Sequence, residues 1–345
     1  MGRTDGGRER RATSTARRDT TETSGNADLG VHPPHASLRL RAATLLRHPA
    51  VRVAGALIGV ALLGAALATV FMRRELLDEA WKALARPNPK LAATLVLAIL
   101  GNLLCTAMVF LALLSRFGRV RPGEMIELIA ASTLLNFVPM RPGLFGRIAW
   151  HRAVNGIPAM NTARTIVESI GLSATCVALL ATGLLVGHGL ALAPPLELAC
   201  GLGAPLLAPL AAVAIRPLRP FAVAAFFRVL DLHLWGLRYG VAFVMIGSPV
   251  PAEAAMALAA SSTAASLVPL AGNGLGLREW TTAMLAPLLA NVDMHLAITA
   301  ELVNRAAEIA VVVPAGLLSI AALVRRRRAM RKGEDGEGMA AGEQG

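Results

Sequence analysis

One short string of residues occurs twice in this strongly apolar chain. Residues 132–139 read Ser-Thr-Leu-Leu-Asn-Phe-Val-Pro, and residues 262–269 read Ser-Thr-Ala-Ala-Ser-Leu-Val-Pro. Each copy passes through a stretch with Gly or Pro into the pattern Gly-Leu-x-x-Arg, at 143–147 and at 274–278. Leu, Ala and Val match by chance in apolar chains, whereas the Ser-Thr, Pro, Gly and Arg matches keep their order. Paired broken segments are typical of transporter binding sites, so the string predicts an internal duplication with a shared site.

The composition of the chain is that of a protein with several membrane spans. Hydrophobic residues make up 55% of the chain and charged residues 16%, and the mean hydropathy is +0.56. The net charge of +12 would also suit a nucleic-acid partner. The basic residues, however, lie in the tails and short loops, a distribution that membrane orientation explains better. We therefore predict a multi-pass protein of a bacterial-type plasma (inner) membrane that binds no nucleic acid.

Six apolar runs are long enough to cross a bilayer, which takes about 20 residues per span. They are roughly 53–72, 91–115, 162–187, 196–215, 228–248 and 294–324. The repeated segments at 124–138 and 252–268 are shorter, and at about 1.5 Å per residue they do not cross a core of about 30 Å. Broken backbone at membrane depth persists only when it is buried in protein or lines a wet cavity. The expected fold is an all-α polytopic membrane protein with about six spans and two re-entrant segments, or eight helices by another count.

The distribution of basic residues predicts four regions along the chain. Residues 1–37 are expected to be a disordered cytoplasmic tail, because they are Arg-rich and nearly free of apolar periodicity. Residues 38–52 suit a basic amphipathic helix on an anionic membrane surface, or an ordinary flank of the first span. A transmembrane domain then covers 53–325, and a second cytoplasmic tail covers 326–345.

Loop charges predict that the two broken segments dip into the membrane from opposite sides. Arg-rich stretches belong in the cytoplasm and loops without Lys or Arg belong outside. With six spans and both termini cytoplasmic, this pattern requires 124–158 to enter and leave from the cytoplasm and 252–292 to enter and leave from outside. The result is an inverted repeat. The loop at 73–90 is basic although it is assigned outside, and we expect a short interfacial helix there.

Charged residues in or beside the membrane segments are the candidate functional residues, because an intramembrane charge is costly. Arg141, Arg147 and Arg278 lie at the tips of the broken segments. Arginines facing each other from opposite leaflets would form a phosphate site, with helix N-termini as further donors. Alternatively, each arginine pairs with a local carboxylate, such as Arg278 with Glu279 or Glu168, and only holds its loop.

The last span carries a second charged group that includes Glu301, Arg305 and Glu308. Glu301 and Arg305 are four residues apart in the order that favours an ion pair, and we interpret them as a structural pair. A proton relay through Glu168 or Glu308 is the alternative. The sequence contains no nucleotide, nucleophile or zinc motif, so no catalytic residue, metal or cofactor is expected.

The two broken motifs resemble those of a known family. Asn136-x-x-Pro139-x-Arg141-x-Gly143-x-x-x-Arg147, followed by Glu168, resembles the first motif of the lysylphosphatidylglycerol synthase transmembrane family, or flippase-like integral membrane proteins. The second motif is similar to Pro269-x-x-Gly272-Asn273-Gly274-Leu275-Gly276-Leu277-Arg278-Glu279, with Arg305 on the last span. The resemblance covers roughly 50–325 and implies a lipid-handling domain with two re-entrant elements. The candidate lipid-binding or translocation residues are Asn136, Pro139, Arg141, Gly143, Arg147, Glu168, Pro269, Asn273, Gly274, Gly276, Arg278, Glu279, Glu301 and Arg305.

The chain departs from the family pattern at two positions. Leu144 stands where family members usually carry an acid after the glycine, and Ser169 stands where an arginine usually follows the glutamate. Bifunctional members also carry a soluble aminoacyl-transferase domain. Here the chain ends shortly after the basic run at 325–328, so we expect no lysyl transfer and no enzyme activity.

The leading functional hypothesis is a flippase-like protein that moves an anionic or polyprenyl-linked lipid between leaflets. The second hypothesis is a membrane scaffold for a lipid- or glycan-modifying partner enzyme, and a homodimer is a further assembly to consider. The third is an ion-coupled carrier of small solutes, which only the carboxylates Glu168 and Glu308 favour.

Overall fold

The computed structural model describes residues 88–137, 141–190, 213–267 and 276–342, with single residues at 203, 207 and 209. Within these ranges it contains eight α-helices and no strand. Four helices are long and apolar enough to cross a membrane: Pro89–Leu114, Ala159–Val186, Arg219–Met245 and Met294–Met330. They confirm four of the six expected spans and make the chain a multi-pass membrane protein. Several predicted segments lie outside the described residues: the tail at 1–37, the helix at 38–52, the run at 53–72, and most of the loop at 73–90 and of the run at 196–215.

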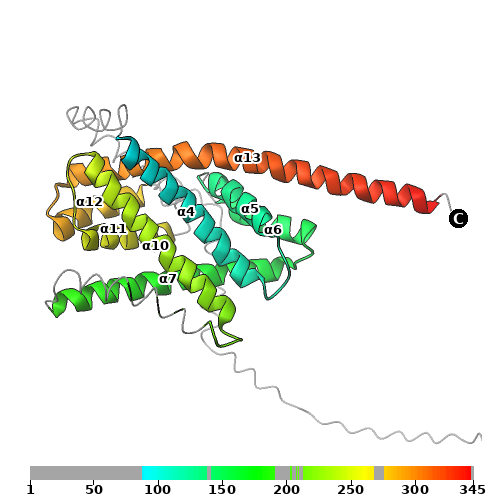
Figure 1. Ribbon diagram of the computed structural model, residues 1–345, viewed down its shortest axis with the longest axis horizontal. Coiled ribbons are helices and arrows are strands. Elements are labelled where there is room, and N and C mark those ends of the chain that lie inside the picture. The colour runs from blue at the N-terminus through cyan, green and yellow to red at the C-terminus, as the bar shows by residue number, and fades with distance from the viewer. Residues whose placement is uncertain are drawn as a thin grey trace, which may run out of the picture. The chain divides into compact units, whose positions relative to one another are not determined.

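The eight helices fall into two sets of four with the same order of lengths. The first half consists of α4 (Pro89–Leu114), α5 (Pro122–Leu135), α6 (Pro142–Val154) and α7 (Ala159–Gly189). The second half consists of α10 (Arg219–Met245), α11 (Ala252–Leu267), α12 (Leu277–Ala290) and α13 (Met294–Gly342). Each half is a long helix, two short helices separated by a break, and another long helix (Figure 1). The repeated string lies at the end of the first short helix in each half.

The break between α5 and α6 has a clear local cause. Arg141 has a left-handed backbone with φ of 49°, which is uncommon for a residue with a side chain. Pro142 then begins α6 at a position where the missing N–H costs no hydrogen bond. A side chain at Gly143 would collide with the backbone oxygen of Ser132 and lie 2.7 Å from Oδ1 of Asn136. The first turn of α6 therefore packs directly on the last turns of α5, and only glycine permits that approach.

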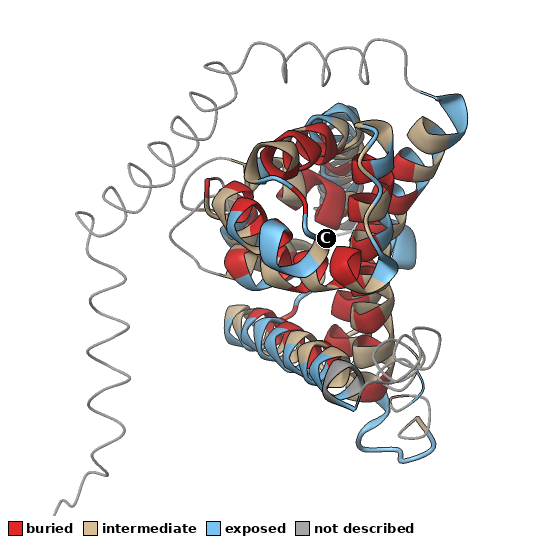
Figure 2. Ribbon diagram, turned by 90° about the vertical axis from the view of Figure 1, so that its left-hand side faces the viewer, coloured by how far each residue is buried: buried red, intermediate tan, exposed pale blue. Residues whose placement is uncertain are grey.

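The two halves pack through an exchange of helices. α4 and α10 run along each other at the centre of the bundle (Figure 1). The last long helix of each half packs on a short helix of the other half, α13 on α5 and α7 on α11. Figure 2 shows buried residues where the helices face one another and exposed residues on the outer faces. Several large apolar side chains on these outer faces are about two-thirds exposed or more, among them Leu97, Val167, Leu185 and Leu288. Such exposure is expected of surfaces that contact lipid.

Candidate functional site

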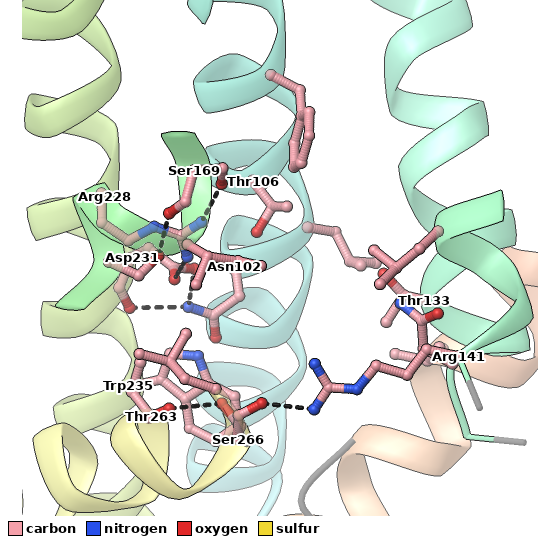
Figure 3. Close-up of a pocket in the computed structure, with 18 of the residues that line it drawn as sticks. Asn102, Thr106, Thr133, Arg141, Ser169, Arg228, Asp231, Trp235, Thr263 and Ser266 are labelled. Atoms are coloured by element: carbon pink, nitrogen blue, oxygen red, sulfur yellow. Dashed lines mark hydrogen bonds and ion pairs between the residues drawn. The ribbon is translucent and has the colours of Figure 1, made fainter. Parts of the chain in front are cut away.

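A cavity of about 230 Å³ lies where the two halves meet. Both copies of the repeated string line it, through Thr133 and Asn136 at the end of α5 and through Thr263 and Ser266 at the end of α11. Figure 3 shows α11 on one side of this space and the break before α6 on the other. The remaining wall comes from α4, α6, α7, α10 and α13. The two broken segments therefore contribute corresponding residues to one site.

The cavity wall carries more positive than negative charge. Its described lining contains the four arginines Arg141, Arg147, Arg228 and Arg238 but only two carboxylates, those of Asp231 and Glu308. At membrane depth such an excess is unfavourable unless an anion compensates it.

Asp231 on α10 is neutralised by its neighbours. Nη1 of Arg228 donates to its Oδ2 at 2.8 Å, and Nδ2 of Asn102 on α4 donates to its Oδ1 at 2.8 Å. Nη2 of Arg228 also donates to Oγ of Ser169 on α7 at 3.4 Å, so this cluster joins three helices (Figure 3). The apolar run predicted a span from 228, but the helix begins earlier, at Arg219, so Arg228 lies within α10 and lines the cavity.

Glu308 on α13 is shared by arginines from two other helices. Nη2 of Arg238 lies 3.0 Å from Oε2 of Glu308, and Nη1 of Arg278 lies 3.3 Å from the same oxygen. Arg238 also donates from Nε to Oδ1 of Asn304 at 3.0 Å and from Nη1 to Oδ1 of Asn102 at 3.1 Å. Both carboxylates of the described lining are thus already bound by arginines.

Arg278, the arginine of the second motif, is 1% exposed and contacts two carboxylates and a hydroxyl. Its Nη2 lies 2.8 Å from Oε1 of Glu301, its Nη1 contacts Glu308, and its Nε donates to Oγ of Ser262 at 2.9 Å. Its guanidinium also lies over the ring of Trp235, 4.5 Å from the centroid. Ser262 belongs to the repeated string, so the string and the arginine of the same motif bond directly.

These contacts correct two expectations about ion pairs. Arg278 pairs with Glu301 and Glu308 and not with the suggested Glu279 or Glu168. Nε of Arg305 lies 3.7 Å from Oε1 of Glu279, and so the expected pair of Glu301 with Arg305 inside one helix gives way to pairs between α12 and α13. Side chains four residues apart on a helix are near neighbours, but a partner on the facing helix approaches them more closely here.

Arg147, the arginine of the first motif, has a different environment. It is 6% exposed and lines the cavity, and its guanidinium lies over Phe110, 4.5 Å from the ring centroid. Its Nε and Nη1 have no hydrogen-bond acceptor among the described residues. Within the same part of the chain, no carboxylate oxygen lies within 4.0 Å of its nitrogens. The α7 residues that face the cavity are uncharged: Ile166, Ser169, Ile170 and Ser173.

Arg141 joins the two broken segments across the cavity. Its Nη2 donates to the backbone oxygen of Ser266 at 2.6 Å, and Figure 3 shows its side chain reaching toward that residue. Ser266 lies in the last turn of α11, where helix carbonyls lack partners within the helix and a cation is favoured. The first break therefore caps the helix that precedes the second break.

Of the other residues expected at the site, some lie at the cavity or near it, one lies apart from it, and some lie outside the described residues. Asn136 lines the cavity, and its Oδ1 accepts no hydrogen bond from the described residues. Glu168 lies apart from the lining and bonds to Arg116 and to Nε of Arg164, the latter at 2.9 Å. Gly276 precedes α12 with φ of 77°, and Glu279 is fully buried. Pro139, Pro269, Asn273 and Gly274 lie outside the described residues.

Sequence reasoning missed most of the contribution of α10. Arg228, Asp231, Trp235 and Arg238 all line the cavity. A usable signal was present, because charges at 228, 231 and 238 fall inside or at the edge of an apolar run where each of them needs a partner. Their spacing by three and seven residues also places them on one helix face.

The chain was compared with family models, with curated proteins and with solved structures. None of these comparisons gave a match. The cavity is therefore interpreted from its own geometry.

Proposed function

We propose that this chain is a flippase-like integral membrane protein that binds the phosphate-bearing headgroup of an anionic or polyprenyl-linked lipid and moves it between leaflets. The proposal rests on Arg147, a buried arginine that has no counter-ion among the described residues. A buried cation without a counter-ion is strongly unfavourable, and a phosphate presents oxygens that match a guanidinium fork. Arg141 on the same wall adds further positive charge, whereas the charge of Arg228 is balanced by Asp231.

The proposal includes the topology that the loop charges predict. Six spans would hold two re-entrant pairs, α5–α6 and α11–α12, which start from opposite sides, with both chain termini in the cytoplasm. Transporters with inverted repeats place their binding site between the two copies near the bilayer midplane. The convergence of Thr133 and Asn136 with Thr263 and Ser266 on one cavity supports that arrangement. The same topology suits the lysylphosphatidylglycerol synthase transmembrane family that the two motifs resemble.

Lipid movement tests the proposed function directly. The purified protein is reconstituted into liposomes that contain acyl-labelled phosphatidylglycerol, and a membrane-impermeant quencher reports the label that reaches the outer leaflet. We expect movement with the natural chain and a loss of about 10- to 100-fold in Arg147→Gln, because a charge-assisted hydrogen bond contributes about 1.5–3 kcal/mol. Arg152→Gln is the matched control, since Arg152 is an exposed arginine on the same helix.

Two outcomes would contradict the proposal. If Arg147→Gln and Arg152→Gln move lipid at the same rate as the natural chain, the cavity is not the lipid path. If the natural chain moves no lipid but retains a lipid- or glycan-modifying enzyme during purification, the scaffold hypothesis replaces the flippase hypothesis.

Cysteine labelling tests the topology. In a variant without Cys105, Cys176 and Cys200, single cysteines are placed at Ala153, in the last turn of α6, and at Asp293, just after α12. An impermeant thiol reagent should label the first only from the cytoplasmic side and the second only from the outer side. Labelling of both from the same side would exclude an inverted repeat.

A further inference from the structure

The polar groups of the cavity also bear on which headgroup fits. We infer that the site selects an anionic headgroup that carries hydroxyl groups beyond its phosphate and carries no amine. This inference rests on the proposed function, and it adds a choice among lipids that the excess of arginine alone does not specify.

An amine-bearing headgroup finds no available counter-ion in the described lining. The carboxylate of Asp231 is bound by Arg228 and Asn102, and that of Glu308 is bound by Arg238 and Arg278. An ammonium group would have to displace one of these arginines or remain unpaired beside them. Like charges repel strongly where water is scarce, so the wall that attracts phosphate disfavours an ammonium next to it.

The uncharged part of the lining suits hydroxyl groups. Besides apolar side chains, it includes the polar residues Asn102, Asn136, Ser169, Ser173, Thr263 and Ser266. Oγ of Ser173 donates to the backbone oxygen of Ser169 at 2.7 Å, and Oγ1 of Thr263 donates to that of Ala259 at 2.8 Å. Such oxygens keep lone pairs that accept from a ligand, and Oδ1 of Asn136 accepts from no described donor. Ligand hydroxyls would supply the missing donors without adding charge.

The volume of the cavity limits the size of the headgroup that can enter it. Pockets for drug-sized ligands measure about 300–1,000 Å³, whereas this cavity measures about 230 Å³. It suits a phosphate with a small polyol, and the lipid tails would remain outside it.

A panel of acyl-labelled lipids in the same liposomes tests the inference. Phosphatidylglycerol should move fastest, and phosphatidylethanolamine and lysyl-phosphatidylglycerol should each move at least about tenfold more slowly, the ratio that 1.4 kcal/mol produces. Phosphatidic acid, which has the phosphate but no glycerol headgroup, should also move more slowly than phosphatidylglycerol. Equal rates for the amine-bearing lipids would overturn the exclusion of amines, and an equal rate for phosphatidic acid would overturn the role of hydroxyl groups.

The panel separates this inference from the proposed function. If all lipids move equally and all depend on Arg147, the flippase proposal stands and the selectivity fails. If no lipid moves, both fail. If the vesicles instead take up soluble glycerol phosphate without moving lipid, the site recognises the same chemistry from a water-soluble source, and the lipid assignment is overturned.

One matched pair of variants tests the electrostatic cause. Ser173 faces the cavity from α7 and is 3% exposed. Ser173→Asp adds a carboxylate there, and Ser173→Asn adds nearly the same bulk without charge. The ratio of lysyl-phosphatidylglycerol to phosphatidylglycerol movement should rise about tenfold or more in the Asp variant relative to the Asn variant. The same ratio in both folded variants, as judged by detergent melting curves, would show that charge does not set the choice of lipid.

Discussion

Arg147 and Arg278 end the same motif in the two halves of the molecule, yet their surroundings differ. Arg278 contacts two carboxylates of α13 and a serine of its own repeated string. Arg147 lies over Phe110 and faces a stretch of α7 whose cavity residues are uncharged. The same motif therefore serves two purposes. The second copy anchors its broken segment through ion pairs, and the first copy places a cation at the cavity.

The largest change in stability is expected at Arg278. Arg278→Met should reduce the free energy of unfolding by about 3–5 kcal/mol, because it leaves Glu301 and the shared Glu308 buried with less compensation. Denaturant or thermal unfolding in detergent measures this loss. If Arg278→Met is as stable as the natural chain but fails to move lipid, Arg278 is a binding residue, and the assignment of roles to the two halves is wrong.

A smaller effect is expected at the first break. Gly143→Ala should reduce the free energy of unfolding by about 1–3 kcal/mol, the usual cost of overpacking, because the new methyl group meets the backbone of Ser132. Gly146→Ala on the same helix is the control, since nothing lies within 4 Å of a side chain there. That variant should be neutral or slightly stabilising because alanine favours a helix. Equal destabilisation by both substitutions would contradict the close contact of α6 with α5.

The smallest change in stability is expected at Arg147. Arg147→Met should leave the free energy of unfolding unchanged or slightly higher, because it removes a buried charge that lacks a described counter-ion and keeps apolar contact with Phe110. Adding phosphatidylglycerol in a thermal-shift series should raise the Tm of the natural chain and not that of the variant, since a ligand stabilises only the state it binds. A loss of several kcal/mol in lipid-free detergent would instead give Arg147 the structural role of Arg278.

The helices of this chain could be predicted from its sequence better than the contacts between them. The span near 91–115, the short helices and the arginines at the breaks follow from run length, Pro and Gly positions and the cost of intramembrane charge. The partners of Arg278 did not follow, because they depend on which faces of α12 and α13 meet. Local spacing favoured Glu301 with Arg305, whereas packing between helices gives Glu301 to Arg278.

Two positions depart from the pattern of the family that the motifs resemble, and both line the cavity. Leu144 and Ser169 are uncharged, where that pattern usually has an acid and a base. A carboxylate at position 144 would lie one helical turn from Arg147 on α6 and offer it a counter-ion. The absence of that acid follows from sequence, but its consequence for Arg147 becomes visible only when α4, α6 and α7 are placed together.

The exchange of long helices between the halves has a consequence for biosynthesis. Nη2 of Arg326 on α13 donates to Oε2 of Glu127 on α5 at 3.0 Å, across 199 residues of sequence. At about 5–20 residues per second, the ribosome needs about 10–40 s to deliver the later partner. During that interval α5 is made without α13, the helix on which it packs. The bond of Arg326 to Glu127 and the packing of α5 on α13 therefore form only after the last helix has been synthesised.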